Sequence, residues 1–201
     1  MPFNQTKIYN ELLDILSLNE AQRTKSLRLI FERDFVDKSP VFQKKDIYPT
    51  PQANGEIPMN TLFRHLTTEM QDTQTRHRVF EKDRSMRLHW VRFHLDERKR
   101  DNMLLFSVKE PEGYRTYYYD KDEKYVIVLE PMRNRDAYYL LTAYYIKGKD
   151  AQRDKMMKKY KRRLKEILYK QKATNFKICR LPISLSRMSY ELSAKIYFFS
   201  V

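Results

Sequence analysis

Cysteine and glycine are scarce in this 201-residue chain. Cys179 is the only cysteine, which excludes an internal disulfide framework and a zinc cage of two or more thiolates. The 3 glycines leave neither a phosphate-cradling loop nor a flexible glycine and serine linker, so P-loop nucleotide chemistry is not encoded. No HExxH or comparable spacing joins the 4 histidines. We therefore expect no metal site and no cofactor.

Long apolar runs are also missing. No stretch approaches the ~20 residues that a membrane span needs. The first residues, MPFNQTKIYNELLDIL, lack the basic and apolar regions of a secretory signal. We therefore expect a cytoplasmic protein that does not enter a membrane.

Positive charge and aromatic rings are abundant. The chain has 40 Lys and Arg against 26 Asp and Glu, a formal charge of +14, and 13% of its residues are aromatic. Rings and branched residues favour one compact domain with extensions, and the charge favours a polyanionic partner, above all RNA. Two alternatives stay open: the charge serves only solubility, or the basic C-terminal helix binds an anionic membrane surface.

Apolar spacing divides the chain into an α+β order of elements. Residues 4–16, 18–35, 61–70, 79–96 and 151–172 have helical periodicity, and residues 41–60 are rich in proline. Runs 103–108, 114–119, 124–130 and 137–146 predict a four-stranded antiparallel sheet. We expect N-terminal helices and a connector over 1–58, a core over 59–172 with helices on one sheet face and RNA on the other, and a C-terminal tail over 173–201.

The predicted helix over 79–96 carries two candidate site residues. Arg84 falls within an apolar stripe, where a guanidinium needs a carboxylate, a carbonyl or a bound phosphate as partner. A structural ion pair and a catalytic or phosphate-binding role both fit this position. His89 lies on the polar side with Arg92, where an imidazole can act as general acid or base, although a structural histidine fits as well.

Strand alternation places Arg115, Tyr117 and Tyr119 on one sheet face. Aromatic rings on a sheet stack on splayed RNA bases, and a nearby guanidinium can hold the phosphate between them. The alternative is ordinary cross-strand packing of the rings.

The last predicted strand brings a hydroxyl and a phenol to one face, those of Thr142 and Tyr144. Such groups can orient a phosphate or hydrogen-bond its oxygens. Lys147, Lys149 and Arg153 follow, at the start of a basic helix that offers either a phosphate-binding face or a solvated surface.

Three segments together resemble a known superfold. RVFEKDRSMRLHWVRFHL, then YRTYYYDKDEKYVIVLE, then YYLLTAYYI with a Lys-rich helix, is similar to the barnase, EndoU, colicin and RelE-like (BECR) ribonucleases, particularly their phage-associated and polymorphic-toxin branches, from about residue 61 to about residue 170. The resemblance implies RNA cleavage without a metal, by attack of the 2′-hydroxyl on the adjacent phosphorus. It implies that His89, Arg115 and Thr142 are the site residues, supported by Arg84 and Tyr144.

The expected function is therefore a metal-independent endoribonuclease, a toxin or defence effector that an acidic antitoxin or immunity protein restrains. The alternative is a non-catalytic module that binds RNA or adapts one protein to another.

Overall fold

The structure is a computed structural model that describes residues 2–52, 55–72, 74–75, 77–152 and 154–168. The predicted tail over 173–201 and Arg153 lie outside the described residues. The helices are α1 (Pro2–Gln5), α2 (Glu20–Phe31), the π-helix Glu32–Val36, α3 (Pro58–Thr67), α4 (Lys82–Ser85), α5 (Leu88–Leu95), α6 (Gly148–Gln152) and α7 (Lys155–Lys161). The strands are β1 (Val41–Phe42), β2 (Lys45–Pro49), β3 (Thr68–Met70), β4 (Arg78–Phe80), β5 (Met103–Glu110), β6 (Gly113–Asp120), β7 (Tyr125–Pro131) and β8 (Tyr138–Tyr145).

The predicted α+β class and the antiparallel meander β5 to β8 are confirmed. Within the described residues the main sheet has 6 strands rather than four, in the order β1-β2-β8-β7-β6-β5, and it is mixed because β2 runs parallel to β8. The two extra strands come from the proline-rich connector. Pro49 ends β2, where a missing N–H does least harm, and Phe42 and Ile47 are buried.

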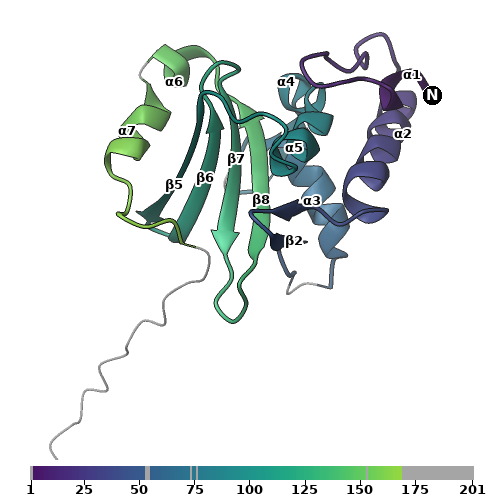
Figure 1. Ribbon diagram of the computed structural model, residues 1–201. Helices are drawn as coiled ribbons and strands as arrows, with labels where there is room; N and C mark the ends of the chain where they lie inside the picture. The colour runs from purple at the N-terminus through teal and green to yellow at the C-terminus, as the bar shows by residue number, and fades with distance from the viewer. Residues whose placement is uncertain (1, 53–54, 73, 76, 153, 169–201) are drawn as a thin grey trace, which may run out of the picture.

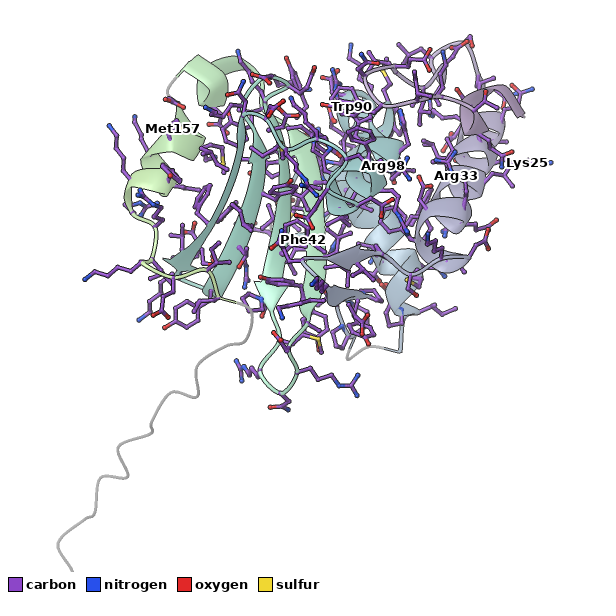
Figure 2. All side chains as sticks on the ribbon, in the orientation of Figure 1. Lys25, Arg33, Phe42, Trp90, Arg98 and Met157 are labelled. Atoms are coloured by element: carbon purple, nitrogen blue, oxygen red, sulfur yellow. The ribbon has the colours of Figure 1, made fainter. Side chains whose placement is uncertain are left out.

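The main sheet is covered on both faces (Figure 1). The helices α3 and α5 pack on one face, with α2 outside them against α5, around a core that includes Phe42 and Trp90, which Figure 2 labels. On the other face α7 packs Met156 against Phe106, Tyr117 and Tyr119. The prediction of an open sheet face is therefore wrong, because the apolar seam of the basic helix closes that face. No helix in the described part of the chain is long and apolar enough to cross a membrane.

Three of the predicted helices differ in the structure. The helix predicted over 151–172 is divided into α6 and α7, and α7 ends at Lys161, although residues 162–168 are described. Residues 4–16 form only the end of α1 and then irregular chain. Residues 79–96 divide into β4, α4 and α5, because β4 pairs with β3 in a small hairpin and Arg87 leaves helical backbone angles between α4 and α5. The helix predicted over 18–35 is confirmed as α2 and the π-helix, and a capping box between Asn19 and Gln22 begins it.

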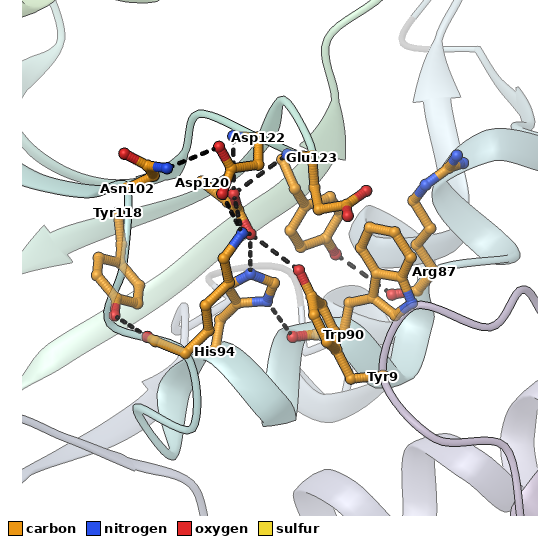
Figure 3. A network of polar contacts seen from close by, with 11 residues as sticks. Tyr9, Arg87, Trp90, His94, Asn102, Tyr118, Asp120, Asp122 and Glu123 are labelled. Carbon is orange, nitrogen blue, oxygen red and sulfur yellow. Dashed lines mark hydrogen bonds and ion pairs between the residues drawn. The ribbon is translucent and has the colours of Figure 1, made fainter.

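A buried carboxylate, Asp120 at the end of β6, joins segments that are distant in sequence (Figure 3). It accepts hydrogen bonds from Tyr9 Oη at 2.9 Å, from His94 Nε2 on α5 at 3.0 Å and from Lys99 Nζ at 2.7 and 2.8 Å. The backbone N–H groups of Asp122 and Glu123 donate to it as well. Burial alone raises the pKa of Asp120, but the hydrogen bonds outweigh it and hold that pKa well below its usual range.

We predict that Asp120→Asn lowers the free energy of unfolding by about 3–5 kcal/mol at neutral pH, because Lys99 and His94 then face a neutral amide. The lowered pKa means that the carboxylate stabilises the fold above about pH 4 and loses this effect as the pH falls further, so the variant should lose less stability on acidification. Urea unfolding of the wild type and the variant, at neutral pH and at a pH below about 4, measures this difference.

Asp122→Asn is the matched control, because its half-exposed carboxylate also pairs with Lys99. It should cost less than about 1 kcal/mol. Equal losses for the two variants would contradict the central position of Asp120.

Candidate functional site around Arg84

Arg84, on the one-turn helix α4, points toward the second half of β8. Its Nη1 donates to the carbonyls of His65 and Thr68 at 2.7 Å each and to Thr142 Oγ1 at 3.2 Å. These partners are neutral, and Arg84 Nε is buried with no hydrogen-bond partner among the described residues. Burial lowers the pKa of Arg84. The hydrogen bonds of its Nη1 within the described residues therefore reach neutral oxygens, while the negative charge of Glu81 opposes the effect of burial on its pKa.

A β-bulge positions the hydroxyl that Arg84 contacts. Leu129 pairs with Leu140 and Val128 with Thr142, so Leu141 is the extra residue on β8. Thr142 Oγ1 lies 3.3 Å from the carbonyl of His65, the same oxygen that Arg84 contacts. The bulge shifts the alternation of side chains along β8 by one residue, and Thr142 beyond it meets Arg84.

The ring of Tyr144 lies beside the same cation, 5.9 Å from Arg84 Cζ. Burial raises the pKa of Tyr144 to about 12, so its phenol keeps its proton at neutral pH. Tyr144 and Arg84 line one cavity of about 200 Å³, together with Lys147 and Glu81. This cavity gives a ligand access to the Arg84 side chain.

His65, at the end of α3, is the titratable group of this site. Burial lowers its pKa, and the positive charges of Arg78 and Arg64 lower it further. A hydrogen bond with the backbone of Leu141, the bulged residue, acts in the opposite direction. The imidazole is therefore neutral at pH 7 and can accept a proton.

Arg78 completes the cluster from β4. Its Nε donates to Thr68 Oγ1 at 2.8 Å and its Nη2 to the Thr68 carbonyl at 2.9 Å. Burial and the charges of Arg84 and Arg64 lower the pKa of Arg78. We call His65, Arg78, Arg84, Thr142 and Tyr144 the Arg84 cluster, a concentration of positive charge beside a neutral imidazole.

Lys147 does not contribute a free cation here. Its Nζ donates to Glu81 at 2.7 Å and to Asp83 at 2.6 Å, and the bond to Asp83 is the main cause of its raised pKa. Glu81 also accepts from the backbone N–H of Arg84 at 2.6 Å, as the N-cap of α4. Lys147 therefore holds in place the two carboxylates at the start of α4. Lys149, another predicted site residue, lies exposed on α6.

The structure places His89 apart from the Arg84 cluster. His89 is only 5% exposed, and its ring lies under the N-terminal segment with Nε2 3.1 Å from the carbonyl of Ile8. Burial lowers its pKa more than that hydrogen bond raises it. Arg92, one turn later, donates to the carbonyls of Asp34 and Lys38. His89 and Arg92 thus lie together beside the N-terminal segment and the π-helix, away from the Arg84 cluster.

Arg115 also lies apart, paired with Glu130 at 2.9 Å across β6 and β7. Tyr117 and Tyr119 are 5% and 7% exposed beneath α7, and Tyr117 Oη donates to Glu110. Rings covered in this way cannot stack on bases while α7 is in place. The predicted catalytic set is therefore divided: Arg84, Thr142 and Tyr144 come together, and His89 and Arg115 lie elsewhere.

His65 and Arg78 were not among the candidate site residues predicted from the sequence. His65 sits in a short amphipathic helix whose apolar residues dominate the pattern, and Arg78 lies in a hairpin strand of 3 residues. In the sequence, the one feature that points to His65 is its position between Arg64 and the apolar residues of the same helix, which are buried in the structure. Only the packing of α3 against β8 brings it to Thr142.

No protein-family model, curated protein or solved structure matches this chain.

We predict that Arg78→Gln raises the pKa of His65 toward its ordinary value, because a positive charge that disfavours the imidazolium is removed. Titration of the histidine rings by NMR measures this. Arg135→Gln, a change in the exposed β7–β8 loop, is the control and should leave the pKa of His65 unchanged. A wild-type His65 pKa above the ordinary value would contradict the site as described.

Proposed function

We propose that the chain is a metal-independent endoribonuclease whose site is the Arg84 cluster. One observation carries the proposal: Arg84 Nη1 and Thr142 Oγ1 meet at the backbone carbonyl of His65, whose neutral imidazole hydrogen-bonds the backbone of Leu141 and lies close enough to Arg84 for that charge to lower its pKa. Base, cation and hydrogen-bond donor are the groups that cleavage of RNA by its own 2′-hydroxyl requires.

In the proposed reaction His65 takes the proton of the 2′-hydroxyl, because its lowered pKa keeps it neutral and able to accept. The 2′-oxygen then forms a bond to the adjacent phosphorus, and the bond from phosphorus to the 5′-oxygen breaks. Arg84 and Arg78 stabilise the negative charge that develops on the phosphate oxygens. Arg84 is suited to this because its Nη1 is held by neutral oxygens, so no carboxylate of the described residues occupies that nitrogen in place of a phosphate.

The leaving 5′-oxygen needs a proton, and Tyr144 is the proposed donor. Its raised pKa keeps the phenol protonated, and its ring lies against Arg84 in the same cavity. Thr142 hydrogen-bonds a phosphate oxygen in this scheme. The products are a 2′,3′-cyclic phosphate and a free 5′-hydroxyl, and no metal takes part.

The order of elements supports the resemblance to the BECR ribonucleases. A helix, α5, precedes an antiparallel meander, β5 to β8, and the hydroxyl of the TAY segment, Thr142, lies in the last strand. The proposal differs from the sequence analysis in its histidine: His65 takes the role first given to His89. A toxin or defence role, restrained by an acidic partner, extends this proposal.

A second candidate function is the non-catalytic RNA-binding or adaptor module. One observation favours it: Arg84 Nη1 is occupied by three acceptors of the protein itself, as in a structural arginine. Binding of RNA without cleavage would select this candidate.

We predict cleavage of a mixed tRNA and mRNA substrate in excess EDTA, with fragments that end in 2′,3′-cyclic phosphate. His65→Gln should slow cleavage by about 10²–10⁴-fold, because the base is lost. Thr142→Val should slow it by about 10²-fold, because one donor to the phosphate is lost. End-group analysis and initial rates measure both effects.

His77→Gln is the matched control, since His77 is exposed in the β3–β4 turn, and it should keep the wild-type rate. His89→Gln decides between the two histidines and should also keep most of the rate if its thermal midpoint is retained. Loss of cleavage with His89→Gln but not with His65→Gln would return the role to His89, and cutting that requires a metal would overturn the mechanism.

A further inference from the structure

A second cavity lies on the far side of α5 from the sheet, between the N-terminal segment and the π-helix. It has a volume of about 460 Å³, which lies in the usual range for small-molecule sites. His89, Arg92 and Phe93 of α5 form one wall, and the opposite wall holds Arg33 of the π-helix. None of the residues of the Arg84 cluster lines this cavity.

The lining of this cavity is cationic. The described residues that line it include two carboxylates, Asp34 and Asp96, and a larger number of cationic side chains. The cations come from separate parts of the chain and are Lys7, Arg33, Lys38, Arg92 and Arg98. Figure 2 labels Arg33 and Arg98 in the region between α5 and α2. Convergence of distant cations on one concave surface raises the local concentration of anions.

Hydrogen bonds hold the cavity walls in place. Arg92 Nη1 donates to the carbonyls of Asp34 and Lys38 at 2.9 and 2.6 Å, and its Nε lies 2.9 Å from Asp96. Arg33 forms a two-point pair with Asp34 at 2.6 and 2.7 Å. The cavity is therefore formed before a ligand arrives, which favours binding.

The π-helix Glu32–Val36 is an independent observation at the same place. π-helical turns are rare and frequently lie at functional sites, because the wider turn moves side chains away from their α-helical positions. Here the π-helix supplies both Arg33 and Asp34 to the cavity wall. A ring pair adds an apolar part: Tyr9 and Phe93 stack with centroids 3.9 Å apart and both line the cavity.

We infer that this cavity, which we call the His89 cavity, binds a phosphate-bearing ligand of about the size of a nucleotide. The cations receive the phosphate, and the rings of Tyr9 and Phe93 offer an apolar edge to the remainder of the ligand. The buried imidazole of His89 forms part of the inner wall, where a bound anion favours its protonated form. A free nucleotide and the phosphate end of an RNA chain share this chemistry, and the inference does not depend on cleavage at the Arg84 cluster.

Calorimetric titration of the full chain tests the inference, with adenosine monophosphate and a short 5′-phosphorylated RNA as probes at low salt. We expect saturable binding of at least one probe. Lys38→Glu should weaken it about tenfold, because an exposed cation at the cavity mouth becomes an anion. Lys121→Glu is the matched control, since Lys121 is exposed in the β6–β7 turn outside the cavity, and it should keep the wild-type affinity.

Two further measurements locate the site. Arg84→Gln should leave the affinity for adenosine monophosphate unchanged, which separates this cavity from the Arg84 cluster. NMR titration should shift the ring resonances of His89 and leave those of exposed His77 in place. Three results would overturn the inference. They are no saturable binding of either probe, equal weakening by Lys38→Glu and Lys121→Glu, and loss of adenosine monophosphate binding in Arg84→Gln.

Discussion

The buried charge of Asp120 is the constraint on which the arrangement of this protein depends. A carboxylate without access to water must be matched by donors, and here these come from the N-terminal segment, from α5 and from the chain that follows it. Tyr9, His94 and Lys99 can all reach it only when the helical layer lies in one position on the sheet. That position also sets α4, which precedes α5 directly, and so directs Arg84 toward β8.

Both cation-rich sites result from how α4 and α5 are held. Arg84 faces α3 and β8, and in the described part of the chain the acceptors of its Nη1 are carbonyls and a hydroxyl. His89 and Arg92 face the N-terminal segment and the π-helix instead. The break at Arg87 separates the two directions. Residues that one continuous helix would have placed along two stripes are therefore divided between two separate surfaces.

Alternation of rings and branched residues was sufficient to predict β5 to β8, because such strands are long and their pattern is local. β2 and the β3–β4 hairpin were not predictable in the same way, since short strands between prolines or polar residues depend on a partner for their hydrogen bonds. The same limit applied to the site. Thr142 and Arg84 carry visible chemistry in the sequence, whereas His65 joins them only because a bulge at Leu141 and the end of α3 meet.

The sequence by itself determined the α+β class, the meander and the excess of positive charge, because composition and short-range periodicity are properties of neighbouring residues. Tertiary structure alone decided which charges are exposed and which polar groups meet. It covered Tyr117 with α7, so the sheet face that strand alternation had predicted to bind RNA is instead part of a second hydrophobic core. It also placed the backbone of His65 beside Arg84 and the ring of His89 beside Ile8, since such distances depend on long-range packing that sequence spacing does not contain.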